Sequence, residues 1–212
     1  MKKIDTTLYF ITDSTPYNEE EFLERVEKAL SGGVTIMQLR EKDRTTREYI
    51  SLAEKVHSIA QKYKVPLIID DRTDVALAVG AEGVHLGQSD MPIDTARKIV
   101  GDKMIIGATT KTVEQALEAV KNGADYLGVG AIYPTTTKVK TVLTSVDTLE
   151  DICRAVNVPV NAIGGLNKDD CNILENTGIS GICVVSAIMK SPKPQKAATE
   201  LRQISERLKL SI

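Results

Sequence analysis

Three polar side chains at alternating positions follow an apolar run and could together bind an anion. The run Val34–Met37 is followed by Gln38, Arg40 and Lys42. In a strand, alternation places these three side chains on one side. A buried parallel strand should not continue into an amide and two cations unless they meet water or a ligand. The set suits a phosphate or pyrophosphate; the alternative is a solvated turn between a strand and a helix.

Carboxylates follow two further apolar runs. Asp70 and Asp71 come directly after Leu67-Ile68-Ile69, and Asp90 comes shortly after Val84-His85-Leu86. Carboxylate oxygens beside a cationic clamp are expected to bind Mg²⁺ shared with a pyrophosphate. The alternative is that these residues cap helices expected at 73–79 and 93–100. From these residues alone, both interpretations remain open.

One loop carries several hydroxyls and an ammonium group. The stretch 134–138 includes Thr135, Thr137 and Lys138 and follows an expected strand at 126–130. Its hydroxyls can donate to an anion, and its cation can neutralise a leaving group. The alternative is a solvated loop, and the loop position of Lys138 argues against a Schiff base. Thr109, after the fifth expected strand, is a weaker signal that could be only a helix cap.

A second anion site is expected from backbone groups. Gly164-Gly165 follows the seventh expected strand, and Val185-Ser186 begins a helix after the eighth. Exposed N–H groups beside a helix start are typical of barrel phosphate sites. His85 is expected to fill a core layer and His57 to pack on a helix face. No Ser-His-Asp or Cys-His order supports nucleophilic hydrolysis.

A recurring joint indicates how these residues are positioned. Four times a helix ends at glycine and a short turn leads into an apolar strand, at Gly32-Gly33, Gly80, Gly123 and Gly178. Helical spacing of apolar residues supports helices at 46–63 and 112–122. The expected strands cover residues 8–12, 35–39, 67–70, 83–86, 104–107, 126–130, 160–163 and 181–185.

Eight alternating βα units predict an α/β protein with a closed (β/α)₈ TIM barrel, small for its class. The alternative is an open doubly wound sheet, which would usually carry a glycine-rich nucleotide motif after its first strand. Thr12-Asp13-Ser14-Thr15-Pro16 is not such a motif. In a barrel, chemistry belongs on the loops after the strands, where all the residues singled out above would lie.

Composition limits the class of protein. The 212 residues and 23.1 kDa suit one domain, so we expect a single barrel catalytic domain over 1–212. The net charge of −2 argues against nucleic acid, and no apolar run reaches membrane-spanning length. The three cysteines lack Cys-x-x-Cys spacing, so neither a disulfide framework nor a zinc site is expected. We expect a cytoplasmic protein with reduced thiols.

The loops taken together resemble the thiamine phosphate synthase (thiamine-phosphate pyrophosphorylase) family. The matching segments span essentially the whole chain in family order, and they are specific as a set although each alone is weak. They are Leu8-Tyr9-Phe10-Ile11-Thr12-Asp13, Gln38-Leu39-Arg40-Glu41-Lys42, Asp70-Asp71-Arg72, Gly83-Val84-His85-Leu86-Gly87-Gln88 with Asp90, Gly123-Ala124-Asp125-Tyr126, Pro134-Thr135-Thr136-Thr137-Lys138, Ile163-Gly164-Gly165 and Val185-Ser186-Ala187-Ile188.

The resemblance implies a transferase that joins hydroxymethylpyrimidine pyrophosphate to hydroxyethylthiazole phosphate, giving thiamine phosphate and pyrophosphate. It also implies roles at the matching positions. The pyrimidine diphosphate would be held by Gln38, Arg40, Lys42 and Lys138, and Mg²⁺ by Asp71 and Asp90. The thiazole phosphate would be held by Thr135, Thr137, Gly165, Val185 and Ser186.

Two positions depart from the family pattern. Family members commonly carry Asn-Asp where this chain has Asp70-Asp71, which changes the charge next to the expected metal. Thr109 replaces a frequent Ser and keeps the hydroxyl. Asp70 and Thr109 are therefore expected to contact substrate as well, and no role is expected within 139–146.

Two other functions share parts of this pattern. A related thiazole tautomerase would use the thiazole phosphate site but has no pyrophosphate to hold, so Gln38, Arg40, Lys42 and Lys138 favour the synthase. A non-catalytic phosphate-binding barrel would need only the backbone site after the last two strands. Release of pyrophosphate from both substrates with Mg²⁺ distinguishes the three.

Overall fold

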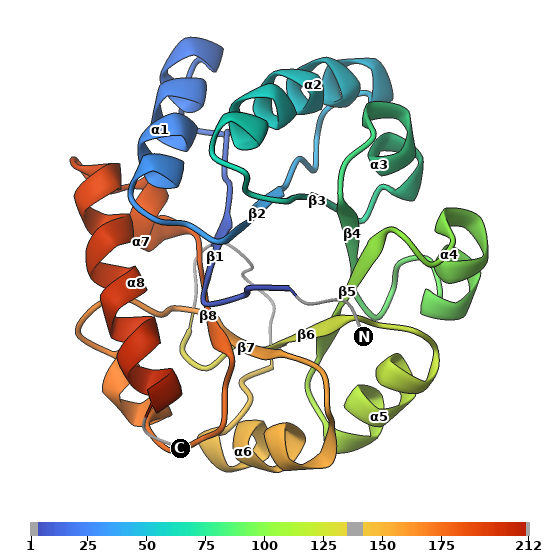
Figure 1. Cartoon of the computed structure of the whole chain (residues 1–212), viewed down its shortest axis with the longest axis vertical. Coiled ribbons are helices and arrows are strands. Elements are labelled where there is room, and N and C mark those ends of the chain that lie inside the picture. Colours follow the sequence, from blue (N-terminus) through green and yellow to red (C-terminus); the bar gives the residue numbers. More distant parts are fainter. Residues whose placement is uncertain (1–3, 135–141, 211–212) are drawn as a thin grey trace.

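The chain forms a closed eight-stranded parallel barrel surrounded by helices, as expected (Figure 1). The computed structural model describes residues 4–134 and 142–210. Strands pair in sequence order, and β8 returns to β1. The strands are β1 (Leu8–Ile11), β2 (Ile36–Leu39), β3 (Leu67–Asp70), β4 (Gly83–Leu86), β5 (Ile105–Thr110), β6 (Tyr126–Gly130), β7 (Val160–Ile163) and β8 (Gly181–Val184).

Alternation along the strands divides the buried residues into two layers. Residues such as Tyr9, Ile36, Ile68 and Tyr126 form a small cluster inside the barrel. Their sequence neighbours, Met37 for example, belong to the larger core between strands and helices. This period of two places every second residue at a strand end in the barrel mouth.

The helices form the outer ring, and four of them (α1, α2, α5 and α6) begin at side-chain caps. Thr45 and Glu48 make a reciprocal capping box at the start of α2, and Asn18 caps α1. Fully buried alanines and aliphatic residues on α2 face the strands. The helices are α1 (Glu19–Ser31), α2 (Thr46–Lys62), α3 (Thr73–Val79), α4 (Ile93–Val100), α5 (Val113–Lys121), α6 (Val146–Ala155), α7 (Ser186–Met189) and α8 (Pro194–Leu210).

Two elements differ from the sequence prediction. β5 continues to Thr110 and does not end near residue 107, because its pairing with β6 reaches Thr110 opposite Val129. Between β7 and β8 the chain makes only a short 3₁₀ turn, η1 (Cys171–Leu174), where alternation predicts an α-helix. Two helices, α7 and α8, follow β8 and complete the ring.

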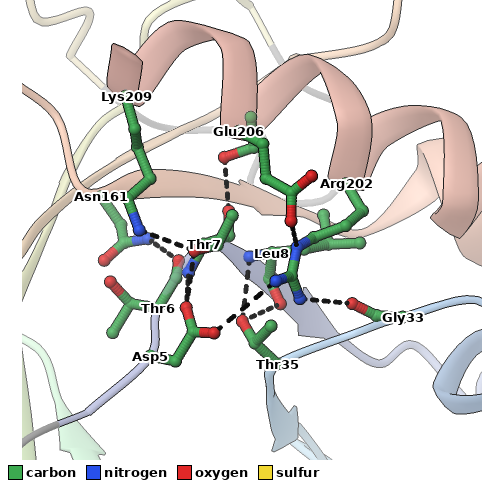
Figure 2. Close-up of polar contacts among 11 residues, drawn as sticks. Asp5, Thr6, Thr7, Leu8, Gly33, Thr35, Asn161, Arg202, Glu206 and Lys209 are labelled. Atoms are coloured by element: carbon green, nitrogen blue, oxygen red, sulfur yellow. Dashed lines mark hydrogen bonds and ion pairs between the residues drawn. The ribbon is translucent and has the colours of Figure 1, made fainter.

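Side chains of α8 fasten the start of β1 at the end of the barrel opposite the mouth (Figure 2). Ser205 Oγ donates to the carbonyl of Thr7 at 2.5 Å, and Lys209 Nζ donates to Thr7 Oγ1 at 2.8 Å. Arg202 donates to the carbonyl of Gly33, next to β2, and lies 3.8 Å from Asp5. From the other side, Asn161 of β7 donates to the carbonyl of Thr6. These contacts join the last helix to the first strand.

We expect Ser205→Ala to lower the free energy of unfolding by about 1 kcal/mol and to leave turnover unchanged. Ser205 is fully buried, and its hydrogen bond to Thr7 would be lost. The Thr7 carbonyl would keep its bond from the Ile182 N–H, which limits the loss. Urea denaturation measures it. Ser31→Ala, which loses an exposed hydroxyl contact to Lys28, is the matched control.

None of the helices in residues 4–134 and 142–210 combines the length and apolar character that a membrane crossing requires.

Candidate active site

A cavity of about 470 Å³ opens at the C-terminal ends of the strands. Its wall includes side chains or backbone from most strands, because each strand delivers an inward-facing residue there. Ten of the residues expected to bind substrate or metal line it: Gln38, Arg40, Lys42, Asp70, Asp71, Asp90, Thr109, Gly165, Val185 and Ser186.

Two cations meet two carboxylates at the end of β2 and β3. Lys42 Nζ lies 2.7 Å from Asp70 Oδ2 and also pairs with Asp71, and Arg40 Nε lies 3.8 Å from Asp70. Burial acts against the charge on Lys42, but the two aspartates raise the pKa of its ammonium. Burial, and next the charge of Asp71, raise the pKa of Asp70. The buried Asp70 Oδ2 lacks a well-aligned hydrogen bond, so this cluster is incompletely satisfied.

The carboxyl groups of Asp71 and Asp90 act on each other's pKa. Burial and a hydrogen bond with Asp71 raise the pKa of Asp90. Burial opposes ionisation of Asp71, but hydrogen bonds with Lys42 and Asp90 bring its pKa below the usual value. Asp71 has a positive φ of 59°, and its N–H donates to the carbonyl of His85. The loop after β3 is thus bent to bring this carboxylate to Asp90.

The helix-capping interpretation of these carboxylates is wrong. α3 begins after Arg72, and α4 begins after Pro92, and neither residue makes a side-chain cap. Asp90 Oδ2 instead accepts the N–H of Gly87 at 2.7 Å, which holds the loop after β4. Arg72 pairs with Asp74 and not with Asp70.

The donor set fits a hard divalent cation bound jointly with a ligand. A hydrogen bond between Asp71 and Asp90 shifts the pKa of each carboxyl group, and a cation would relieve the repulsion between them when both are ionised. Within the described ranges, no group of three or more His, Cys, Asp or Glu residues could hold a metal ion. Mg²⁺ commonly uses one or two carboxylates, completing its shell with water and phosphate oxygens.

His85 combines a core position with a place in the cavity wall. It is 8 % exposed, in keeping with the expected core layer, but it also lines the cavity. Its Nε2 lies 2.9 Å from Thr109 Oγ1. Thr109 is therefore part of the wall rather than a helix cap, because Thr112 caps α5.

Sequence reasoning missed Lys111, which also lines the cavity. Its Nζ donates to the carbonyls of Gly130 and Val142, both at 2.7 Å. It thereby ties the end of β5 to both sides of the segment that carries residues 135–141. The available signal was a lysine two positions after Thr109, which was overlooked because the expected strand ended too early.

Backbone groups form the opposite side of the cavity. Gly164 and Gly165 have φ values of 106° and 68°. A side chain on Gly165 would come within 2.6 Å of Tyr133 Cβ and 2.8 Å of the Pro134 carbonyl oxygen, so only glycine fits without movement. Val185 and Ser186 complete this side. Thr135, Thr137 and Lys138 lie outside the described residues.

The three cysteines are free thiols; Cys171 and Cys183 are buried, and Cys153 is partly buried. Burial raises the pKa of Cys153 to about 12 and that of Cys171 to about 11. The pKa of Cys183, which lines the cavity, is also raised by burial. Such thiols remain protonated at neutral pH and are poor nucleophiles.

A family model and two relatives that the chain matches carry the same activity in their names. The model of the thiamine monophosphate synthase family matches residues 8–188. The chain is 46% identical to a thiamine-phosphate synthase from Clostridium tetani over 200 residues, covering 94% of this chain and 96% of that one. It is 51% identical to thiamine-phosphate synthase 2 of Streptococcus pneumoniae serotype 4, covering 87% and 88%.

Solved structures agree. A thiamine phosphate pyrophosphorylase from Pyrococcus furiosus is 42% identical and superimposes with a TM-score of 0.87, covering 95% of this chain and 96% of that one. A 3-hexulose-6-phosphate synthase has a TM-score of 0.73 at 18% identity, covering 93% and 99%, and shares the fold. The chain belongs to the thiamine monophosphate synthase family and is a transferase of that family.

Proposed function

We propose that the protein joins hydroxymethylpyrimidine pyrophosphate to hydroxyethylthiazole phosphate, releasing pyrophosphate and forming thiamine phosphate. The observation that supports this is one cavity with two chemically different sides, each suited to an anion. Arg40, Lys42 and the paired Asp71 and Asp90 lie on one side, and glycine-rich backbone lies on the other. Two phosphorylated small molecules are the ligands that such a cavity fits.

We assign the diphosphate to the cation-lined side. Gln38, Arg40, Lys42 and Lys138 would hold the pyrimidine diphosphate, with Asp70 and Thr109 also contacting it. Gly165, Val185 and Ser186, with Thr135 and Thr137, would hold the thiazole phosphate. The separation of the two sides supports this assignment, because like-charged phosphates repel when they share one site.

Catalysis would rest on charge neutralisation and positioning. An electron-rich aminopyrimidine can lose pyrophosphate to leave a stabilised benzylic-type cation, which the thiazole nitrogen traps. No protein nucleophile is needed, in keeping with the protonated thiol of Cys183 in the cavity wall. Arg40, Lys42 and Lys138 would meet the charge that builds on the departing pyrophosphate. The cavity would hold the thiazole nitrogen facing the exposed carbon.

We propose Mg²⁺ as the cofactor, held by Asp71 and Asp90. When bound, it would neutralise charge on the pyrophosphate and so assist its departure. Lys42, which pairs with both Asp70 and Asp71, would then be shared between the carboxylates and the diphosphate.

The decisive experiment is a pyrophosphate-release assay with the full chain. We expect release only when both substrates and Mg²⁺ are supplied, loss of release with a chelator, and recovery when Mg²⁺ is restored. Isomerisation of a thiazole without pyrophosphate release would favour a tautomerase. Binding of thiazole phosphate without turnover would favour a non-catalytic barrel. Full turnover in metal-free buffer would remove the metal from the proposal.

Asp70→Asn is expected to spare or improve the KM for the pyrimidine diphosphate while weakening apparent Mg²⁺ affinity. Asp70 competes with the ligand for Lys42 and adds negative charge beside the diphosphate. Parallel substrate and Mg²⁺ titrations of the two proteins measure both effects. Unchanged Mg²⁺ affinity would remove Asp70 from the metal's surroundings, and a raised substrate KM would contradict the competition.

A further inference from the structure

A continuous chain of hydrogen bonds crosses the inside of the barrel beneath the cavity. Gln38 Nε2 donates to the Tyr9 hydroxyl at 2.7 Å, and that hydroxyl lies 2.6 Å from the hydroxyl of Tyr126. Tyr126 lies 3.0 Å from His85 Nδ1, and His85 Nε2 lies 2.9 Å from Thr109 Oγ1. Both ends, Gln38 and Thr109, line the cavity from strands β2 and β5.

The middle of this chain is sealed from solvent. Tyr9 and Tyr126 are fully buried, and their rings cross edge to face at 76° with centroids 5.5 Å apart. Burial places the pKa of both hydroxyls far above neutral, so each carries one proton to donate. In such a setting every donor needs an acceptor, because an unmade buried hydrogen bond is costly.

The barrel leaves room for this chain by means of a glycine. A Cβ atom on Gly107 of β5 would lie 2.2 Å from the Tyr126 hydroxyl oxygen and 2.5 Å from His85 Nδ1. Any side chain there would separate Tyr126 from His85. The contact between these two residues is thus built into the strand that also carries Thr109.

Fixing the first hydrogen bond of this series, from Gln38 to Tyr9, fixes which group donates in each later bond. An amide nitrogen only donates, so the Tyr9 oxygen accepts from Gln38. The Tyr9 proton then goes to Tyr126, the one acceptor that this hydroxyl contacts among the described residues. The Tyr126 proton then goes to His85 Nδ1. His85 is therefore the neutral form protonated on Nε2, which donates to Thr109 Oγ1. The hydroxyl proton of Thr109 is left to point elsewhere.

We propose that Tyr9, Tyr126 and His85 are positioning residues that couple the orientation of the Gln38 amide to the donor direction of the Thr109 hydroxyl. The cavity then presents an amide oxygen as acceptor on one wall and a hydroxyl donor on another. An aminopyrimidine carries the complementary groups, an amino donor and ring-nitrogen acceptors. The match to an aminopyrimidine rests on the proposed function. The coupling between Gln38 and Thr109 does not, because it is expected in the protein without ligand.

The coupling can be tested by NMR without substrate. The chain has two histidines, His57 and His85, so a [¹⁵N]histidine-labelled sample gives two ring systems, and His57→Gln assigns them. We expect His85 to be protonated on Nε2. In Gln38→Glu, at a pH of about 8.5, the carboxylate only accepts, so every bond reverses and His85 becomes protonated on Nδ1.

Removing the link should abolish this response. In the double variant Tyr9→Phe/Gln38→Glu, residue 38 no longer has a hydrogen-bonded link to Tyr126. We therefore expect the His85 tautomer to match that of Tyr9→Phe alone. A wild-type His85 protonated on Nδ1, or an unchanged tautomer in Gln38→Glu, would overturn the coupling. These results do not depend on turnover, so they are distinguishable from failure of the proposed function.

Kinetics test the positioning role. Tyr126→Phe should raise the KM for the pyrimidine diphosphate about tenfold and leave that for the thiazole phosphate unchanged. Tyr49→Phe is the matched control. It also loses a buried hydroxyl bond, to the carbonyl of Leu39, but Tyr49 is not part of the hydrogen-bond series from Gln38 to Thr109. If Tyr126→Phe fails to fold, Tyr9→Phe takes its place. Equal changes for both substrates, or none, would overturn positioning.

Discussion

Asp90→Asn is expected to lower kcat/KM for the pyrimidine diphosphate by about 100-fold or more, with a much smaller effect on thiazole phosphate binding. The substitution removes one of the two carboxylates proposed to hold Mg²⁺ beside the diphosphate. It keeps an oxygen that can accept the Gly87 N–H, so the loop after β4 should be preserved. The loss would therefore report the missing charge and not a collapsed loop.

Steady-state kinetics across a Mg²⁺ titration measure this effect. Asp94→Asn is the control, because Asp94 is exposed on α4 and pairs with Lys98. Lowering the pH should have the same effect as Asp90→Asn, because protonation also removes the negative charge. Burial and Asp71 raise the pKa of Asp90, so Asp90 takes up a proton at a higher pH than an ordinary aspartate. Apparent Mg²⁺ affinity should fall as pH falls through that range. Equal Mg²⁺ dependence in both variants would contradict the assignment.

Lys42→Met should lower kcat/KM by roughly 100- to 1,000-fold, the scale of losing a preorganised charge-stabilising group. Lys42 pairs with Asp70 and Asp71, so its removal also leaves two adjacent carboxylates without their shared cation. The pKa of Asp71, which Lys42 helps to lower, should then rise. The acid limb of the pH–rate profile should accordingly move to higher pH.

The same assays with Lys55→Met provide the control, because Lys55 is a half-exposed lysine that pairs with Glu19 on the outer ring. A Lys42→Met protein with near-normal kcat/KM would show that the lysine only neutralises the carboxylates. A loss without movement of the acid limb would show that Asp71 does not depend on Lys42.

The barrel and most of its mouth could be predicted because both follow from period-two alternation. Polar residues that interrupt an apolar strand had to face the barrel axis, and Gln38 and Asp70 do so. The glycine joints likewise located helix ends, and Gly80 adopts the left-handed conformation after α3. Local sequence is sufficient to predict a feature when the backbone of one residue, or the alternation along one strand, determines that feature.

The cross-barrel contacts could not be predicted in this way. Tyr9 and Tyr126 look like ordinary core aromatics in the sequence, and nothing local shows that their hydroxyls meet 117 positions apart. Lys111 was missed because strand pairing with β6, not local pattern, sets where β5 ends. The 3₁₀ turn η1, which replaces the helix expected between β7 and β8, could not be predicted either, because it depends on packing and not on local sequence.

Fastening of β1 by α8 has a consequence for the order in which the protein is made. Thr7 leaves the ribosome early, but Ser205, its partner, is 198 residues away. β1 also lacks its neighbour β8 until residues 181–184 have been synthesised. A nascent chain therefore carries an open sheet, with the β8-facing edge of β1 unpaired, until β8 has been synthesised. The barrel cannot close before β8 and α8 have left the ribosome, so chains stalled before α8 should be protease-sensitive and prone to aggregation.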